Sequence, residues 1–437
     1  MPFTRRQYLA LIVLALGMRL GVLVGLYTQP GFFDPYYVTD HWDHISRNVI
    51  AGNGFSWTED GTVPTITRGP GYVGFLTVLS LLTHGNLLAM RVLYLLLDVV
   101  LVVLVARLSY EVIASRKGAI LAGVVYAMYP IPPWHIVKLS PDAFFSFVLI
   151  SSLLLFLTTM ERHGPAPRYR RVVAAGVLLG LAILTKKIAL IVAPAWLLIA
   201  LWSRRFAGGT WTRAVVYAVV AGLVVAPWLY RNYRVAGRPA PLQTMTWHVF
   251  WYGEFVDREG GGVESADFEN RAVDFLGSLT GERPYRISHE LTPQEDLERE
   301  AELKALALQH IRENPRAMAD KVRRNLLRFW YRTESGRMSR YTGAMGATLF
   351  LLMLAGAGSL VASHRFDARV ATLLVTIVLF QLAYAPVLSH IRYMIPVAPY
   401  ISIFGGYGVY RLWEWLRHHP PKGYLSSLRA RRRPIPH

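Results

Sequence analysis

Long apolar runs recur along the chain, separated by short segments rich in lysine and arginine. Several runs reach about 20 residues, the length that a helix needs to cross the hydrocarbon core of a bilayer. The pattern predicts an all-α polytopic membrane protein with about ten transmembrane helices. The expected spans are 8–27, 87–106, 118–134, 142–159, 171–185, 188–203, 214–230, 342–362, 370–388 and 394–412.

The first run follows Arg5 and Arg6, and so has the positive flank of a secretory signal peptide. Its apolar core is too long for one, and no small-x-small cleavage site follows before Pro30. We therefore predict a retained first span.

The apolar stretch from Gly71 to Thr83 is too short for an ordinary span. If it crossed, every later loop would change sides, and the basic loops would face outward against the positive-inside rule. The sequence therefore predicts a re-entrant or surface-lying helix there, with both termini in the cytoplasm.

Two long segments, 28–86 and 231–341, then lie outside. In the second, Thr292 and Glu295 form a capping box that predicts a helix to about Glu313. Asn314 and Pro315 start another helix to about Arg332, either in the headgroup layer or as a soluble cap. We expect one membrane domain over 1–437, with juxtamembrane helices in 28–86, a small outer subdomain in 231–341 and a basic cytoplasmic tail at 413–437.

Composition agrees with a membrane location. Of 437 residues, 53% are hydrophobic and only 17% charged, with a formal net charge of +19. The positive charge sits in short loops between apolar runs and in the tail, which favours membrane lipid rather than nucleic acid as partner. The chain has no cysteine, which excludes disulfides, thiolate metal ligands and a cysteine nucleophile.

Isolated polar residues gather at the predicted outer ends of the spans. Acids together with cations at membrane depth suggest a site for an anionic substrate and for acid–base chemistry. Lysine and arginine suit a phosphate, and a carboxylate suits a general base. The candidates are Asp40, Asp43, Arg68, Lys138, Asp142, Lys186, Lys187, Arg231, Asn232, His390, Arg392 and Tyr393.

Each candidate also has a purely structural explanation. Asp40 and Asp43 have helical spacing and could solvate or cap a surface helix, and Asp142 could complement the dipole of a span. Arg68 could be a turn residue, while the later cations could extend to lipid headgroups. The Asp–His pairs at 40–41 and 43–44 could hold a metal, but no fixed-spacing signature completes the set, so no metal site is predicted.

Two charges lie deeper in the apolar runs, Arg19 in the first span and Asp98 in the second. Their estimated depths are similar. We expect them to form a structural ion pair.

Short motifs are spread along the chain: Asp40-His41-Trp42, Ser46-Arg47-Asn48, Gly52-Asn53-Gly54-Phe55, Arg68-Gly69-Pro70-Gly71-Tyr72, Ser140-Pro141-Asp142, Gly180–Lys186, Pro227–Tyr233 and His390–Pro396. In their order and spacing they resemble those of polyprenyl-phosphate-sugar-dependent glycosyltransferases of GT-C fold, in particular the superfamily of dolichyl-phosphate-mannose protein mannosyltransferases and aminoarabinose transferases. The resemblance covers nearly the whole chain apart from 243–290 and the tail.

The resemblance implies an inverting transferase that needs no cofactor. Its donor would be a polyprenyl-phosphate sugar and its acceptor a lipid, glycan or protein at the outer face of the cell (inner or plasma) membrane. Asp40 would be the general base, with Asp43 or Asp34 as alternatives, because the family acid usually stands at the place of Val38. Asp142 would orient the acceptor or sugar, and Tyr72 would join the cations in binding substrate.

Two other functions fit the same pattern. A non-catalytic transporter or flippase of lipid-linked sugars would share the basic outer cavity, although the matched, broken half-helices typical of transporters are not visible. A structural subunit of an envelope complex would tolerate the loss of single acids.

Overall fold

The computed structural model describes residues 3–28, 42–58, 60–159, 169–203, 210–259, 266–282, 286, 290–333 and 336–419. Within these residues the regular elements are helices, and a single isolated β-bridge joins Ser56 to Pro64. The predicted all-α fold class is confirmed.

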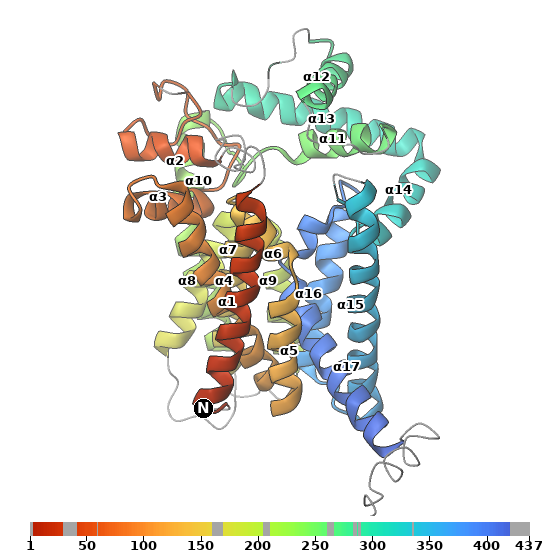
Figure 1. Ribbon diagram of the computed structural model, residues 1–437. Coiled ribbons are helices and arrows are strands. Elements are labelled where there is room, and N and C mark those ends of the chain that lie inside the picture. Colours follow the sequence, from red (N-terminus) through yellow and green to blue (C-terminus); the bar gives the residue numbers. More distant parts are fainter. Residues whose placement is uncertain are drawn as a thin grey trace, which may run out of the picture.

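Most of the helices form one elongated bundle (Figure 1). Helix α1 begins and helix α17 ends at the same end of this bundle, which we call the inner end. The bundle helices are α1 (Arg5–Tyr27), α4 (Leu87–Ile113), α5 (Arg116–Met128), α6 (Ile131–Val137), α7 (Pro141–Thr159), α8 (Tyr169–Thr185), α9 (Ala189–Trp202), α10 (Thr210–Ala236), α15 (Gly336–Ala362), α16 (Ala368–Tyr384) and α17 (Ala398–His418).

The predicted run 118–134 is divided between α5 and α6, which are bent by 46° relative to each other. Pro130, Pro132 and Pro133 lie at this break, where they remove backbone donors and end α5. Five described helices are long and apolar enough to cross a bilayer, or six if the bent pair counts as one span. The number of about ten spans stays a prediction.

The other end of the bundle, the outer end, carries the remaining helices (Figure 1). Helices α2 (Trp42–Ala51) and α3 (Pro70–Leu82) lie here, beside an outer subdomain of α11 (Thr246–Arg258), α12 (Ala266–Thr280), α13 (Pro293–Glu313) and α14 (Pro315–Arg328). The capping box at Thr292 is present as predicted. Helix α14 ends at Arg328 rather than at Arg332, because the chain turns there to enter α15.

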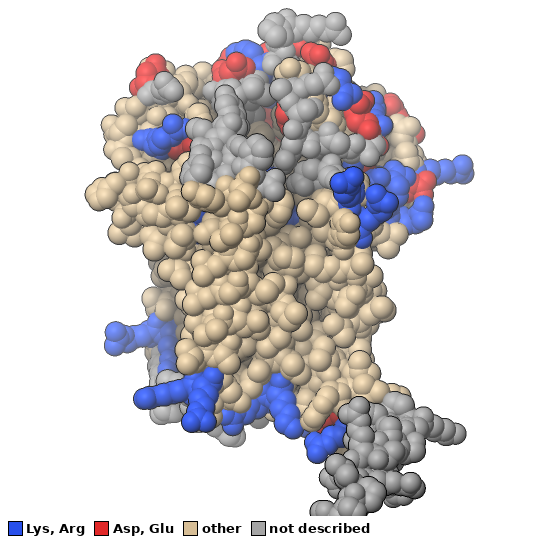
Figure 2. Space-filling model, viewed as in Figure 1, with Lys and Arg blue, Asp and Glu red and all other residues tan. Residues whose placement is uncertain are grey.

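On the face shown in Figure 2, charged side chains occupy both ends of the molecule and leave a belt without them in between. The bundle helices expose apolar side chains such as Val13, Leu20 and Leu354, and we call this region the apolar belt. The inner end shows mainly lysine and arginine, whereas the outer end shows acids and bases together. On this face the inner end therefore has the more uniformly basic surface.

Glycine lets the bundle helices approach closely where α17 crosses its neighbours. A Cβ at Gly406 would overlap the backbone of Ala122 in α5, and a Cβ at Gly356 in α15 would overlap the carbonyl oxygen of Phe404. Small residues at crossings are the usual means by which membrane helices pack.

The two deep charges form the predicted ion pair. Arg19 Nε donates to Asp98 Oδ2 at 2.9 Å, and the second carboxylate oxygen accepts from the Tyr126 hydroxyl at 2.8 Å. Arg19 also donates to the Ala127 carbonyl. Both charged side chains are buried, so this cluster joins α1, α4 and α5 inside the apolar belt.

Candidate functional site

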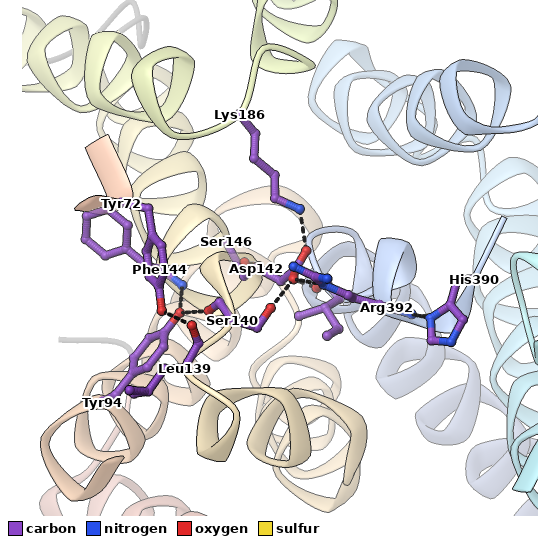
Figure 3. A network of polar contacts seen from close by, with 11 residues as sticks. Tyr72, Tyr94, Leu139, Ser140, Asp142, Phe144, Ser146, Lys186, His390 and Arg392 are labelled. Carbon is purple, nitrogen blue, oxygen red and sulfur yellow. Dashed lines mark hydrogen bonds and ion pairs between the residues drawn. The ribbon is translucent and has the colours of Figure 1, made fainter. Parts of the chain in front are cut away.

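At the outer end of the bundle, two cations meet one buried carboxylate (Figure 3). Asp142, in the first turn of α7, is completely buried. Its Oδ1 pairs with Lys186 Nζ, its Oδ2 accepts from Arg392 Nε at 2.8 Å, and Ser140 Oγ also donates to Oδ2. The group carries a net positive charge, since the single carboxylate is shared by two cations.

These residues come from three distant segments. Asp142 begins α7, Lys186 directly follows α8, and Arg392 lies in a 3-10 helix, η5 (Ile391–Met394). The structure therefore brings together three of the predicted site residues.

A strained turn sets the position of Asp142. Leu139, in this turn, has φ of 49°, a left-handed conformation that is unfavourable for leucine. The carbonyls of the turn are held by three buried side chains: Arg91 Nε donates to Val137 O at 2.8 Å, the Tyr72 hydroxyl to Leu139 O, and the Tyr94 hydroxyl to Ser140 O at 2.6 Å. Tyr94 also accepts from the Phe144 backbone N–H at 2.8 Å, which fixes the first turn of α7.

The hydroxyl of Tyr72 donates to the backbone carbonyl of Leu139, and the predicted role of Tyr72 in substrate binding stays a prediction. The ring is fully buried and packs edge-on against Trp42 at a centroid distance of 5.5 Å. In this arrangement Tyr72 positions the turn that carries Lys138 and leads to Asp142.

The Gly-Pro-Gly segment after Arg68 packs against the end of α8. A Cβ at Gly69 would overlap the Leu184 carbonyl oxygen, and one at Gly71 would lie 2.5 Å from Thr185 Oγ1. Only glycine permits this approach, which places Arg68 beside the segment that carries Lys186 and Lys187.

Arg68 lies between aromatic rings at the edge of the site. Its guanidinium is 5.1 Å from the ring centre of Trp42 and 5.9 Å from that of Trp57. Such cation–π contacts hold the guanidinium charge in place at the edge of the site.

Arg231 and Asn232 have backbone partners. Arg231 donates to Thr65 O at 2.5 Å and to Phe55 O at 3.1 Å, and Asn232 donates to Pro241 O at 2.8 Å. These contacts tie the end of α10 to the first outer segment. The predicted role of both residues in substrate binding stays a prediction, and their contacts favour positioning.

Lys187 faces away from Asp142 and joins the outer subdomain. Its Nζ donates to Thr244 O at 3.3 Å and to Thr246 Oγ1, while Thr244 Oγ1 donates to Asp296 Oδ2. Burial raises the pKa of Asp296 to about 6, and burial likewise lowers the pKa of Lys187. Asp296 thus connects α13 to the loop of the two lysines.

The C-terminal motif forms a second side of the site. His390 Nδ1 accepts from the Arg392 backbone N–H at 3.0 Å, which fixes the start of η5. Tyr393 stacks on Tyr384 at a centroid distance of 4.2 Å, and His135 of α6 packs edge-on against His390. Lys138 is half-buried in the turn before Asp142.

The acids of the first outer segment are only partly described. Asp43, at the start of α2, pairs with Arg47 at 2.9 Å in an i, i+4 contact. Asp40 and Asp34 lie outside the described residues. The choice of base among these acids therefore stays a prediction.

Three contributors were missed from the sequence: Tyr94, Arg91 and His135. Arg91 interrupts an apolar run, as Arg19 does, and that signal was available. Tyr94 gave little signal, because a tyrosine among apolar residues is ordinary in a membrane helix. Among the residues with described positions, no three His, Asp or Glu side chains gather closely enough to hold a metal.

Comparison with known proteins gives one family match and several similar folds. Residues 67–230 match the family model described as dolichyl-phosphate-mannose-protein mannosyltransferase. This stretch includes Arg68, Asp142 and the three lysines Lys138, Lys186 and Lys187. No curated protein sequence matches the chain significantly.

The solved structures extend the similarity over most of the chain. Oligosaccharyltransferase AglB from Archaeoglobus fulgidus, with an inhibitory peptide and a dolichol-phosphate, aligns with a TM-score of 0.58 at 15% identity, covering 94% of this chain and 51% of that one. The same enzyme tethered to an acceptor peptide gives 0.59, again at 15% identity, over 95% and 51%. ArnT from Cupriavidus metallidurans bound to undecaprenyl phosphate aligns with a TM-score of 0.38 at 15% identity, covering 85% of this chain and 72% of that one.

The chain spans about half the length of the AglB structures, so the likeness concerns the fold. That fold agrees with the helix arrangement, and the family match agrees with the motifs around Asp142. The chain is accordingly a membrane protein with the fold of GT-C glycosyltransferases, and its residues 67–230 match the family model described as dolichyl-phosphate-mannose-protein mannosyltransferase.

Proposed function

We propose that the protein is an inverting glycosyltransferase that moves a sugar from a polyprenyl-phosphate carrier to a lipid, glycan or protein acceptor. The observation that carries this proposal is the convergence of Lys186 and Arg392 on the buried carboxylate of Asp142. Burying cations is costly, and a site that retains two of them at the end of an apolar bundle suits an anion delivered from the membrane.

Asp142 holds the two cations before the donor arrives. Lysine has three N–H donors and arginine five, so contact with Asp142 occupies only part of the donor set of each cation. Ser140 and the turn around Leu139 fix the carboxylate, and the cations therefore need little rearrangement when charge develops. Lys138 and Arg68 would extend the positive surface toward the rest of the donor headgroup.

The reaction would be a displacement at the anomeric carbon. The acceptor oxygen or nitrogen forms the new bond as the bond from the anomeric carbon to the phosphate oxygen breaks, and the bonding electrons leave with the phosphate. The cations stabilise the released polyprenyl phosphate, so no general acid is required. A carboxylate of the first outer segment, Asp40 in this proposal, takes the proton from the acceptor.

We place the site at the outer face of the cell (inner or plasma) membrane, with both termini in the cytoplasm. The mixed charge of the outer end and the basic inner end support this orientation. The AglB structure of similar fold holds a dolichol-phosphate, which supports a polyprenyl phosphate as the carrier.

The phosphate-binding role predicts the effect of Arg392→Ala. Loss of a charge-assisted phosphate contact costs about 1.5–3 kcal/mol, so affinity for polyprenyl phosphate should fall roughly tenfold or more. Titration of the purified protein with polyprenyl phosphate measures the affinity. The control is Arg365→Ala, in the loop between α15 and α16, because it also removes one positive charge. Equal affinities of Arg392→Ala and Arg365→Ala would remove the phosphate role from Arg392.

A further inference from the structure

A group of exposed arginines lies where α14 turns into α15. It consists of Arg323 and Arg324 near the end of α14 and Arg337 and Arg340 in the first turns of α15, and we call it the arginine corner. Figure 2 shows lysine and arginine side chains projecting at this side of the outer end, directly at the border of the apolar belt.

Helix α14 has two different faces. One face is anchored by Lys321, Asn325 and Arg328. Lys321 pairs with Glu254 at 2.7 Å, and Arg328 pairs with Asp257 at 2.7 Å. Asn325 donates to Ala385 O at 2.9 Å. The residues 316, 323 and 327 are spaced by seven and four, so they share another face. That face is exposed, with Arg323 at 72% and Leu327 at 61% exposure.

The corner is held rigidly against the bundle. Gln381 of α16 donates to Leu326 O at 2.7 Å, and Trp330 packs edge-on against Phe350 of α15 at 4.8 Å. Gly346 allows α15 to approach the Trp330 carbonyl, where any Cβ would overlap it. The exposed arginines are therefore presented by a fixed scaffold.

Two features identify the partner. Arg337 and Arg340 stand at the N-terminal end of α15, where cations oppose the helix dipole and an anion would compensate. Exposed Leu327 and Tyr341 lie among the arginines and continue into exposed apolar residues of α15, including Leu351. A soluble anion would bind through the arginine charges alone, whereas a lipid would contact both the charges and the adjoining apolar surface.

We propose that the arginine corner binds the phosphate headgroup of anionic phospholipid in the leaflet on the side of the outer subdomain. Bound lipid would fix the outer subdomain, through α14, at a constant height over the site. This proposal does not depend on the glycosyltransferase reaction.

The test compares two double variants of the full chain in a nonionic detergent. One variant carries Arg323→Gln and Arg324→Gln, and the other carries Arg337→Gln and Arg340→Gln. Each should lose affinity for phosphatidylglycerol about 30-fold, because each arginine near an anionic lipid contributes roughly 5-fold. Bound lipid per protein, measured by mass spectrometry during titration, gives the affinities. The matched control is Arg271→Gln/Lys304→Gln, which removes two exposed charges from α12 and α13.

Phosphatidylcholine and inorganic phosphate complete the comparison. We expect weaker binding of phosphatidylcholine and no displacement of phosphatidylglycerol by an equal concentration of inorganic phosphate. Equal loss in the control, no preference for the anionic lipid, or displacement by inorganic phosphate would each overturn the proposal. If a variant does not fold, increasing salt must still release phosphatidylglycerol from the unaltered protein, and insensitivity to salt would overturn it too.

Discussion

Asp142→Asn should lower turnover by about 10²-fold or more. The substitution should displace the two cations, and a misplacement of catalytic groups by about 1 Å can have an effect of that size. The amide removes the charge that holds Lys186 and Arg392 together, so two half-buried cations then repel each other. The measurement is the initial rate of sugar transfer by purified protein at saturating donor. Asp274→Asn, an exposed substitution in α12, provides the matched control.

Whether the Asp142→Asn protein remains folded distinguishes a role of Asp142 in positioning the cations from a role in folding. We expect the variant to remain folded, since Tyr72, Tyr94 and Arg91 still hold the turn before α7. Donor affinity should change as well as turnover, because both cations lose their common partner. Normal turnover in a folded Asp142→Asn protein would contradict the role assigned to this carboxylate.

The second large effect concerns stability. Asp98→Leu alone leaves Arg19 charged inside the apolar belt, and breaking a buried pair in this way costs about 3–5 kcal/mol. The combined change Arg19→Met/Asp98→Leu removes both charges and should recover most of that loss. Thermal unfolding midpoints of the purified variants in detergent measure the difference.

The matched control for this pair is Glu111→Gln, which breaks a partly exposed pair with Arg107 in the same helix α4. It should change stability by about 1 kcal/mol or less. If the double change destabilised the protein as much as the sum of the single changes, Arg19 and Asp98 would not act as a pair.

The sequence was most informative where one physical rule dominates. Bilayer length and basic loops predicted the bundle helices, and the capping box at Thr292 predicted the start of α13. The similar membrane depth of Arg19 and Asp98 was enough to predict their ion pair, because two opposite charges in an apolar medium have few other ways to be compensated.

The internal organisation of the site was less accessible. The sequence placed Asp142, Lys186 and Arg392 at one membrane depth, but could not show that all three meet. That contact depends on how α7, α8 and η5 pack, over separations of 44 and 250 residues. The left-handed Leu139 was equally hidden, because its conformation is imposed by Tyr72, Tyr94 and Arg91 rather than by local preference.

Tyr72, Arg231 and Asn232 show how little a motif says about the role of each residue in it. All three were predicted to bind substrate with the cations, and that role stays a prediction, while each donates a hydrogen bond to a backbone carbonyl in the structure. A polar residue near a site can hold the backbone that positions the reacting groups. Sequence pattern alone does not distinguish that use from direct contact with substrate.

The most direct test of the central claim is to incubate the purified protein with polyprenyl-phosphate sugars and acceptor extracts, and to follow free polyprenyl phosphate. We predict release of the free carrier together with transfer of the sugar, and loss of both in Asp40→Asn while donor binding persists. A protein that binds the lipid-linked sugars but never releases the carrier, under all donor and acceptor combinations, would contradict the glycosyltransferase account and favour a transporter.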